Sequence, residues 1–215
     1  MSQLKIGFFG NFYEAFLDLT KDYNIKFVIF EENKENNKII QYCNLNNIRY
    51  FFVKNREDIK KVIAKFNDID LFVVASFGII FDKLILDFPK ISTLNIHPGI
   101  LPKYRGRHPL PQAILNKEKF MGITAHIMTL EIDKGKVVNM TKLKINYDKS
   151  YEYNAKLLLK SLKNFVKEAI NNLLKEKYLP IDEKNSNYYS PLPKEKLELI
   201  CNSKKLKELY IENSN

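Results

Sequence analysis

The sequence has no tryptophan and only two cysteines, Cys43 and Cys201. The two cysteines lie far apart and form no C-x-x-C pair, so the sequence predicts neither a disulfide framework nor a zinc cluster. So few cysteines are typical of a reducing compartment, and we expect a soluble, cytoplasmic protein.

Long apolar runs are also missing. No run reaches the roughly 18 apolar residues that a membrane-spanning helix needs, and the first ten residues predict a buried strand rather than a signal peptide. The three histidines, His97, His108 and His126, do not have a chelating spacing. We therefore expect no membrane partner and no metal site.

Basic residues outnumber acidic ones: the sequence has 35 Lys and Arg and 25 Asp and Glu, which gives a formal net charge of +10. A basic balance can attract nucleic acid, a membrane surface or a phosphorylated metabolite. Here the lysines are dispersed, and those between 156 and 167 recur every three to four residues, as on a solvated helix face. We expect the charge to serve solubility rather than nucleic-acid binding.

The first half of the chain alternates short buried strands with amphipathic helices. This alternation predicts an α/β fold with a doubly wound, Rossmann-like, mostly parallel sheet that carries helices on both faces. Ligands of such sheets bind beyond the carboxyl ends of the strands. The predicted strands are 4–9, 25–30, 49–53 and 70–75, and the predicted helices are 12–21, 36–46 and 56–66.

The second half predicts a different pattern. Four prolines and two glycines in 98–111 are too many for a helix or a central strand, so we expect a functional loop. Other predicted elements are strands at 93–96, 121–128 and 136–145, one long helix at 151–174, a short C-terminal hairpin formed by 188–191 and 197–200, and a helical turn at 204–210.

We divide the chain into a catalytic domain, residues 1–180, and a C-terminal extension, residues 181–215. The expected hairpin in the extension is short, aromatic and apolar. Because a two-stranded hairpin is marginal by itself, we expect it to pack on a second copy and to form a twofold dimer.

Three segments carry candidate chemistry. Asn95 and His97 end a predicted strand and project from the same side of it; Asn can donate to an oxyanion and His can move a proton. Asp133 lies in a turn between two strands, where a carboxylate can orient the histidine. The loop 101–109 is the third. Taken singly, these features also fit a structural histidine, an ordinary Asp-x-Gly turn and a surface Ω-loop.

Taken in order, the segments SFGIIF (76–81), NIHPGILPKYRGRHPLPQAI (95–114) and GITAHIMTLEIDKGKVV (122–138) resemble the folate-dependent formyltransferase family. The resemblance implies that Asn95, His97 and Asp133 are the catalytic trio. It also implies a co-substrate, 10-formyltetrahydrofolate in preference to the 5,10-methenyl form, and no metal. The implied pterin-binding residues are Ser76, Phe77, Gly78, Ile79, Ile80, Ile127 and Leu130.

Two departures from the family pattern reshape the implied pterin site. Phe81-Asp82 stands where Leu-Pro or Ile-Pro is frequent, and Glu131 stands where a glycine usually precedes the Ile-Asp pair. Glu131 cannot reach positive φ as easily as glycine. The mechanism that the family implies is attack of an amine on the formyl carbon, with Asn95 and protonated His97 stabilising the oxyanion while Asp133 orients His97.

Four members of the family compete for the identity of the acceptor. Methionyl-tRNA formyltransferases carry a second domain for which residues 181–215 are too few, and formyltetrahydrofolate hydrolases begin with a regulatory domain. Glycinamide ribonucleotide formyltransferases have a glycine-rich phosphate loop where this chain has GNFYE (10–14). Sugar N-formyltransferases resemble the chain at 101–109 and 187–191, which implies a nucleotide-linked amino-deoxysugar destined for a surface polysaccharide such as lipopolysaccharide.

The expected substrate-binding residues lie in the loop and in the tail; they are Lys103, Tyr104, Arg105, Gly106, Arg107, His108, Tyr188 and Tyr189. Two non-enzymatic alternatives stay open. One is a non-catalytic module that binds folate or a nucleotide, and the other is a nucleic-acid-binding module. An enzyme would turn over a formylated folate, and neither of these two binding modules would.

Overall fold

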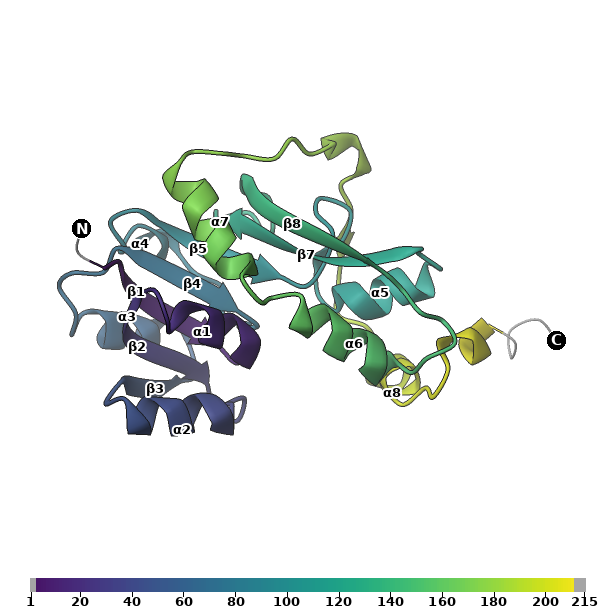
Figure 1. The fold of residues 1–215 in the computed structure, drawn as a ribbon, viewed down its shortest axis with the longest axis horizontal. Helices are drawn as coiled ribbons and strands as arrows, with labels where there is room; N and C mark the ends of the chain where they lie inside the picture. The colour runs from purple at the N-terminus through teal and green to yellow at the C-terminus, as the bar shows by residue number, and fades with distance from the viewer. Residues whose placement is uncertain (1–2, 211–215) are drawn as a thin grey trace.

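The computed structural model describes residues 3–210 and contains a seven-stranded sheet of order β3-β2-β1-β4-β5-β7-β8 (Figure 1). The first five strands in this order are parallel; β7 pairs antiparallel with β5, and β8 pairs antiparallel with β7. This confirms the predicted α/β class and the mostly parallel sheet. The strands are β1 (Lys5–Gly10), β2 (Asn24–Glu31), β3 (Arg49–Val53), β4 (Leu71–Ala75), β5 (Ser92–His97), β7 (Phe120–Ile127) and β8 (Val137–Lys144).

Helices cover both faces of the sheet because its central strands are buried on both sides. In β1, Phe8 faces the core under α1 and α2, and Phe9 faces the core under α3 and α4. On the first face lie α1 (Tyr13–Leu19), α2 (Asn37–Leu45), α6 (Tyr151–Lys160) and α7 (Phe165–Leu174); on the second lie α3 (Arg56–Ile63) and α4 (Lys83–Leu86).

The single long helix predicted for 151–174 is wrong, because the chain turns between α6 and α7. Asn164 takes a left-handed conformation with φ of 63°. The Asp18 carboxylate accepts hydrogen bonds from the backbone N–H groups of Asn164, Val166 and Lys167 at 2.7, 3.0 and 3.1 Å. A carboxylate at this position satisfies amides that an uncapped helix start leaves without partners. The cap comes from a residue far away in the sequence, which helical periodicity does not reveal.

The proline-rich segment 98–111 is not a loop throughout. Helix α5 (Pro109–Leu115) begins at Pro109 and includes Pro111. Proline is compatible with the first helical turn, where its missing N–H has no intrahelical acceptor. The remainder of the segment is irregular apart from the two-residue strand β6 (Arg105–Gly106).

The predicted C-terminal hairpin is also wrong. Strand β9 (Tyr188–Tyr189) pairs in parallel with β6 of the same chain, and the residues expected in the second strand form helix α8 (Lys194–Cys201). Lysine, glutamate and leucine all have high helix propensity, and a helix of these residues is stable when its apolar face is buried. Ile200 of α8 is fully buried. The short helices η1 (Glu183–Asn185) and η2 (Leu206–Tyr210) complete the segment.

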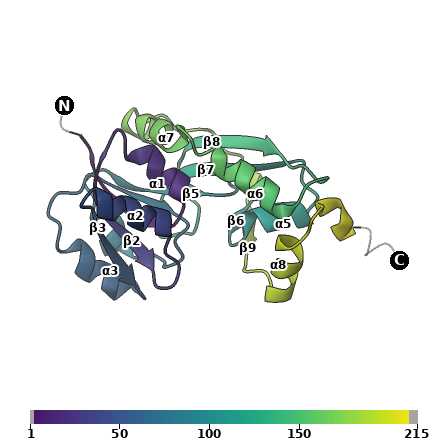
Figure 2. The ribbon, with the colours of Figure 1, turned by 60° about the horizontal axis from the view of Figure 1, so that its bottom comes forward.

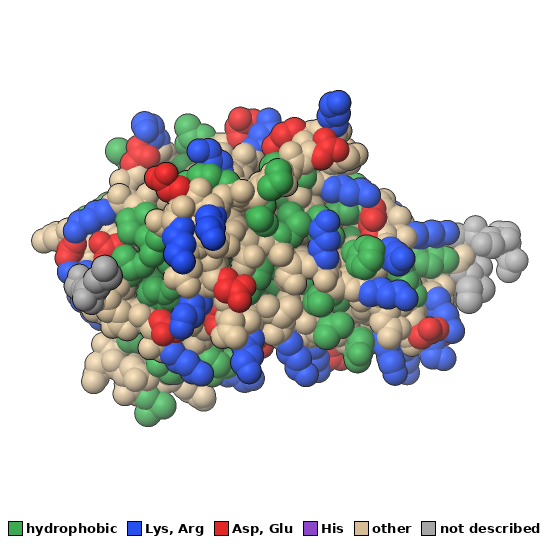
Figure 3. Space-filling view, turned by 45° about the horizontal axis from the view of Figure 1, so that its top comes forward, with side chains coloured by type: hydrophobic (Ala, Val, Ile, Leu, Met, Phe, Trp, Pro, Cys, Tyr) green, Lys and Arg blue, Asp and Glu red, His purple; other side chains and the backbone are tan. Residues whose placement is uncertain are grey.

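The tail thus folds back onto its own domain, and Figure 2 shows α8, β6 and β9 beside α5. Leu206 is fully buried, and the Tyr189 ring stacks on Tyr104 at 5.3 Å between centroids. Lys and Arg side chains are spread over the face shown in Figure 3, with acidic side chains between them, as the dispersed lysines predict. No helix within residues 3–210 is long and apolar enough to span a membrane. The domain boundary at residue 180 and the dimer remain predictions.

Candidate active site

The predicted catalytic residues meet at the carboxyl end of β5, in a cleft of about 550 Å³. Asn95 and His97 alternate with Ile96 along β5, so both side chains face the cleft while Ile96 packs into the core. The turn between β7 and β8 brings Asp133 against them. The structure therefore confirms the convergence that the strand-end motif predicts.

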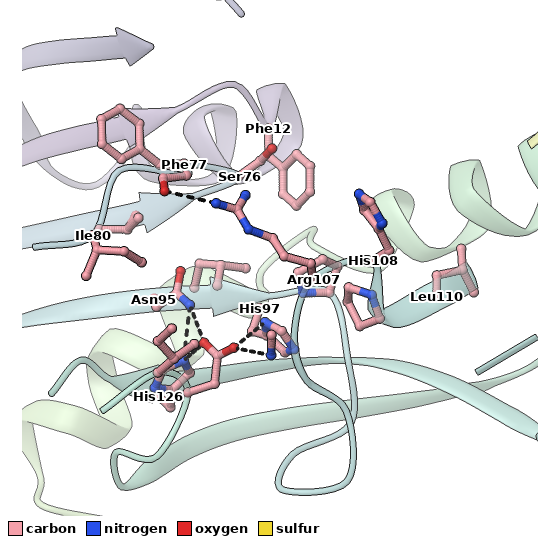
Figure 4. A pocket seen from close by; sticks show the side chains of 18 of the residues that line it. Phe12, Ser76, Phe77, Ile80, Asn95, His97, Arg107, His108, Leu110 and His126 are labelled. Atoms are coloured by element: carbon pink, nitrogen blue, oxygen red, sulfur yellow. Dashed lines mark hydrogen bonds and ion pairs between the residues drawn. The ribbon is translucent and has the colours of Figure 1, made fainter. Parts of the chain in front are cut away.

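The Asp133 carboxylate joins the members of the site (Figure 4). Its Oδ2 lies 3.5 Å from Nδ1 of His97 and accepts a 2.8 Å hydrogen bond from the backbone N–H of Gly106. Its Oδ1 lies 3.4 Å from Nδ2 of Asn95 and 3.3 Å from Nε2 of His126. Only 9% of the Asp133 side chain is exposed, so these contacts replace water around a charge.

The backbone around Asp133 is shaped for this position. Asp133 itself has a φ of 52°, a left-handed conformation that a non-glycine residue seldom adopts. Two residues later, a Cβ on Gly135 would lie 1.6 Å from the carbonyl oxygen of Ile127. The Asp-x-Gly turn is therefore more than a turn signal, because a side chain at Gly135 would force the backbone that carries Asp133 or Ile127 to shift.

Glu131 stands where the family usually has a glycine, and this turn accommodates it without a positive φ at that residue. Glu131 does not take positive φ; the left-handed residue is Asp133. The Glu131 carboxylate pairs with Lys134 at 2.5 Å, and its carbonyl accepts from the Thr129 hydroxyl. The other departure is accommodated too. Phe81 is buried in an aromatic cluster with Phe9, and Asp82 caps α4 by accepting from the N–H of Ile85.

His97 has a hydrogen-bond partner at Nε2 and the Asp133 carboxylate near Nδ1. Its Nε2 lies 2.6 Å from the carbonyl oxygen of Tyr104, and a carbonyl can only accept, so Nε2 carries a hydrogen. Burial lowers the pKa of His97, against the opposing effects of the Asp133 charge and the Tyr104 carbonyl. This direction favours neutral His97 with an unprotonated Nδ1 toward Asp133, in place of the protonated form expected from the sequence.

Burial disfavours the charge on Asp133, but its partners more than compensate. Its contacts with the imidazoles of His126 and His97 and with the amide of Gly106 hold the pKa of the Asp133 carboxyl well below its usual range. The carboxylate is therefore ionised throughout the neutral pH range, and it can stabilise positive charge that forms on His97.

His126 is a member of the site that the sequence reasoning missed. It is 1% exposed, its Nε2 lies 3.1 Å from Nδ2 of Asn95, and its Nδ1 donates to the carbonyl of Ile127 at 3.0 Å. Register places it directly beside Asn95 on the neighbouring antiparallel strand. The sequence shows His126 within a predicted strand, but no periodicity reveals which residue lies next to Asn95.

The expected pterin-binding residues lie along one side of the cleft, with one exception. Ser76, Phe77, Gly78, Ile79, Ile80 and Leu130 line it, whereas Ile127 does not. Met128, the next residue along the chain, lines the cleft instead. The loop 76–81 thus offers apolar side chains and backbone polar groups to the same space.

The expected acceptor-binding residues divide into two groups. Gly106, Arg107, His108 and Tyr188 line the cleft. Lys103 pairs with Glu118, the Tyr104 hydroxyl also bonds to Glu118, Arg105 donates to the carbonyl of Ile132, and the Tyr189 hydroxyl bonds to Asn116; these four lie outside the cleft lining.

His108 connects the cleft to the tail. It starts α5 in a left-handed conformation with φ of 55°, which His and Asn adopt more readily than most residues. Its Nδ1 accepts a 3.1 Å hydrogen bond from the N–H of Leu192. His108 therefore anchors the segment between β9 and α8, and the tail contributes Tyr188, Leu197 and Cys201 to the cleft lining.

The sequence reasoning also missed the apolar end of the cleft. It is built by α5, α6, α8 and the residue that precedes α1. None of the side chains in this part of the lining carries a formal charge at neutral pH. They are Phe12, Leu110, Tyr151, Ala155, Leu158, Leu159, Leu197 and Cys201. Within the described residues, no group of His, Cys, Asp and Glu is arranged to hold a metal ion.

Comparison with protein-family models matches residues 20–170 to the formyl transferase family. The match covers more than half of the chain, and the chain belongs to this family. The methionyl-tRNA formyltransferase of Borrelia garinii subsp. bavariensis is 42% identical over 118 residues, which are 54% of this chain and 37% of that protein. The chain therefore spans only about two fifths of the curated relatives that it matches.

Solved structures share the fold at lower identity. The sugar 3N-formyl transferase WlaRD, solved with dTDP and 5-N-formyl-THF, superposes with a TM-score of 0.69 at 23% identity over 88% of this chain and 70% of that chain. The N-formyltransferase of Helicobacter canadensis, solved with folinic acid and dTDP-3-aminofucose, gives 0.66 at 20% over 88% and 71%. Phosphoribosylglycinamide formyltransferase of Anaplasma phagocytophilum gives 0.70 at 21% over 85% and 92%.

Proposed function

We propose that the protein transfers a formyl group from 10-formyltetrahydrofolate to the primary amine of a nucleotide-linked amino-deoxysugar. The observation that carries the transfer chemistry is the cluster of Asn95, His97 and Asp133 in one cleft, with Asp133 within 3.5 Å of both partners. We further propose that the reaction occurs in the cytoplasm and serves a surface polysaccharide such as lipopolysaccharide.

The lining of the cleft supports folate as the formyl donor. A planar pterin needs an apolar slot with backbone donors and acceptors at its edge. The loop 76–81 and the segment 128–132 line such a slot next to Asn95. When it is bound there, the folate supplies an electrophilic formyl carbon. In this proposal the residues that hold it are Ser76, Phe77, Gly78, Ile79, Ile80, Met128 and Leu130.

Asn95 is placed to stabilise the negative charge that develops on the formyl oxygen. Its Nδ2 approaches His126 at 3.1 Å, whereas the contact with Asp133 is long at 3.4 Å. The N–H group that faces Asp133 is therefore weakly held and can turn to the oxyanion. One such donor contributes roughly 10²–10³ in rate.

His97 moves the proton. As the amine nitrogen bonds to the formyl carbon, Nδ1 of neutral His97 accepts the amine proton, directly or through one water, and later returns it to the departing nitrogen. The Asp133 carboxylate stabilises the imidazolium that exists between these two transfers. Acid–base assistance of this kind contributes roughly 10²–10⁴ in rate.

The nature of the acceptor is supported by the tail. It folds back on β6 and α5 and lines the cleft with Tyr188, Leu197 and Cys201, so the acceptor side is a pocket sized for a small molecule. Arg107 and His108 lie at its edge, where a guanidinium can bind phosphate oxygens. Two of the structural neighbours were solved with dTDP or a dTDP-linked amino sugar.

A second candidate acceptor is methionyl-tRNA. The observation in its favour is sequence identity, because the curated relatives at 38–42% identity are methionyl-tRNA formyltransferases. The apolar end of the cleft would also accommodate a methionyl side chain. Both candidates use the same trio and the same formyl donor, so only the acceptor distinguishes them.

An acceptor panel tests the proposal. Nucleotide-linked 3-amino and 4-amino deoxysugars, glycinamide ribonucleotide and charged initiator tRNA are each offered with 10-formyltetrahydrofolate, and products are followed by mass spectrometry. We expect an amino-sugar nucleotide to gain one formyl group, a mass of about 28 Da, and the same sugar without its amine to stay unmodified. Formylation of the tRNA or of glycinamide ribonucleotide alone would refute the acceptor and leave the chemistry standing.

Dimerisation is a separate proposal. The tail packs on its own chain, but Leu199 on α8 remains 59% exposed. We propose that this side of α8 pairs with that of a second copy around a twofold axis. Sedimentation velocity at micromolar concentration should give about twice the chain mass, and Leu199→Lys should give the monomer. Wild-type protein that sediments as a monomer contradicts the proposal.

A further inference from the structure

Two charged side chains from distant elements bind Gly78 in the loop 76–81. The Glu31 carboxylate, at the end of β2, accepts a 2.5 Å hydrogen bond from the N–H of Gly78. Arg107, in the loop before α5, donates from Nη2 to the carbonyl oxygen of Gly78 at 3.0 Å. Both polar backbone groups of Gly78 are therefore occupied by side chains that come from outside the loop.

Arg107 reaches Gly78 across the cleft. Figure 4 shows the side chain extending from the His108 side, above Asn95 and His97, toward the segment that contains Ser76 and Phe77. The residue is exposed, and among residues 3–210 its guanidinium forms no ion pair within 4.0 Å, although the Glu31 carboxylate holds the other side of Gly78. Within those residues the side chain of Arg107 donates its hydrogen bond to a neutral carbonyl, although a guanidinium binds an anion more strongly.

We propose that Arg107 is a positioning residue with two alternative partners, the Gly78 carbonyl when the acceptor side is empty and the acceptor's phosphate when it is filled. This inference rests on the proposed function. A phosphate offers Arg107 a bidentate, charge-assisted contact that the carbonyl cannot match. Movement of Arg107 to the phosphate frees the Gly78 carbonyl, which then accepts a hydrogen bond from the bound pterin.

Glu31 keeps the loop in place when Arg107 leaves. Its bond to the Gly78 N–H is independent of Arg107, and its other carboxylate oxygen pairs with Lys34 at 2.8 Å. The loop therefore loses one of two attachments rather than both. Because binding free energies are linked, an anion on the acceptor side tightens folate binding, and folate tightens anion binding by the same factor.

Titration calorimetry with 5-formyltetrahydrofolate, in the presence and absence of inorganic pyrophosphate, tests the coupling. For the wild-type chain we expect pyrophosphate to tighten folate binding by about fivefold or more, the lower range of measured couplings. Arg107→Gln should abolish that response. Lys61→Gln, which removes the same charge from an exposed position on α3 outside the cleft, should retain it.

Hydrogen exchange of residues 76–81 gives a second readout that needs no folate. Pyrophosphate should speed exchange in this loop in the wild-type chain and leave it unchanged in Arg107→Gln. Folate that binds with the same affinity with and without pyrophosphate, or a response that persists in Arg107→Gln, overturns the inference while the proposed function stands. A chain that binds no folate overturns both, and unchanged exchange in the wild-type loop also counts against the inference.

Discussion

Replacement of His97 by alanine should lower kcat by about 10²–10⁴, the range of acid–base catalysis, while the fold is retained. The effect is expected because neutral His97 has an unprotonated Nδ1, beside Asp133, that can accept a proton, while Asp133 is held ionised by its partners. Single-turnover formyl transfer measures the change, and circular dichroism with folate-analogue binding reports whether the site persists.

A matched variant separates proton transfer from architecture. In His97→Gln the side-chain amide can still donate to the carbonyl of Tyr104, the contact that His97 makes at 2.6 Å, but it cannot accept a proton near neutral pH. We expect this variant to be as slow as His97→Ala. If His97→Gln turns over nearly as fast as the wild-type enzyme, His97 serves only to hold the loop, and the proposed mechanism is wrong.

Asp133→Asn should cost about 10²–10⁴ in kcat, as expected when the carboxylate that stabilises a catalytic imidazolium is lost. The pH dependence supplies a sharper readout. In the proposed mechanism neutral His97 is the active form, so kcat/KM of the wild-type chain should fall as the pH drops through the pKa of His97. The Asp133 charge raises that pKa against burial, so its removal should move the acidic limb of the residual activity to lower pH. A limb that stays in place would show that Asp133 does not act on His97.

The same substitution should reduce stability in a pH-dependent way. The pKa of Asp133 is depressed in the folded protein, so its stabilising effect is complete above the unfolded pKa of about 3.9 and is lost as the pH falls through the folded value. We expect Asp133→Asn to lower the free energy of unfolding at pH 7 by roughly 1.5–3 kcal/mol, the range for hydrogen bonds to a charged group. Urea unfolding at pH 7 and pH 3 should show the difference shrinking at the lower pH.

The predicted strands of the sheet appear in the structure with small shifts at their ends, and one of them, residues 49–53, has the predicted bounds. Buried parallel strands can be predicted from the local sequence, because each is a short apolar run bounded by turn residues. The trio of Asn95, His97 and Asp133 was predicted from the resemblance to the formyltransferase family, because each motif taken singly also fits a structural role. A strand end and a turn are set by neighbours in the sequence.

Three features failed to follow from the sequence because each depends on a distant partner. The break between α6 and α7 depends on the Asp18 cap, and the tail forms a strand because β6 lies beside it. His126 enters the site only because antiparallel register puts it opposite Asn95. Periodicity reports which face of an element is buried, and it does not report what packs against that face.

The sequence by itself determined the α/β class and the order of the elements up to β4, since these follow from local hydrophobic patterns, and its ordered motifs, through the family resemblance, indicated the residues of the trio. Only the tertiary structure decided how the site works. The left-handed conformation of Asp133, the neutral state favoured for buried His97 and the reach of Arg107 to Gly78 are set by atoms that lie far apart in the chain. Protonation and hydrogen bonding depend on distances in space, and spacing along a sequence does not encode those distances directly.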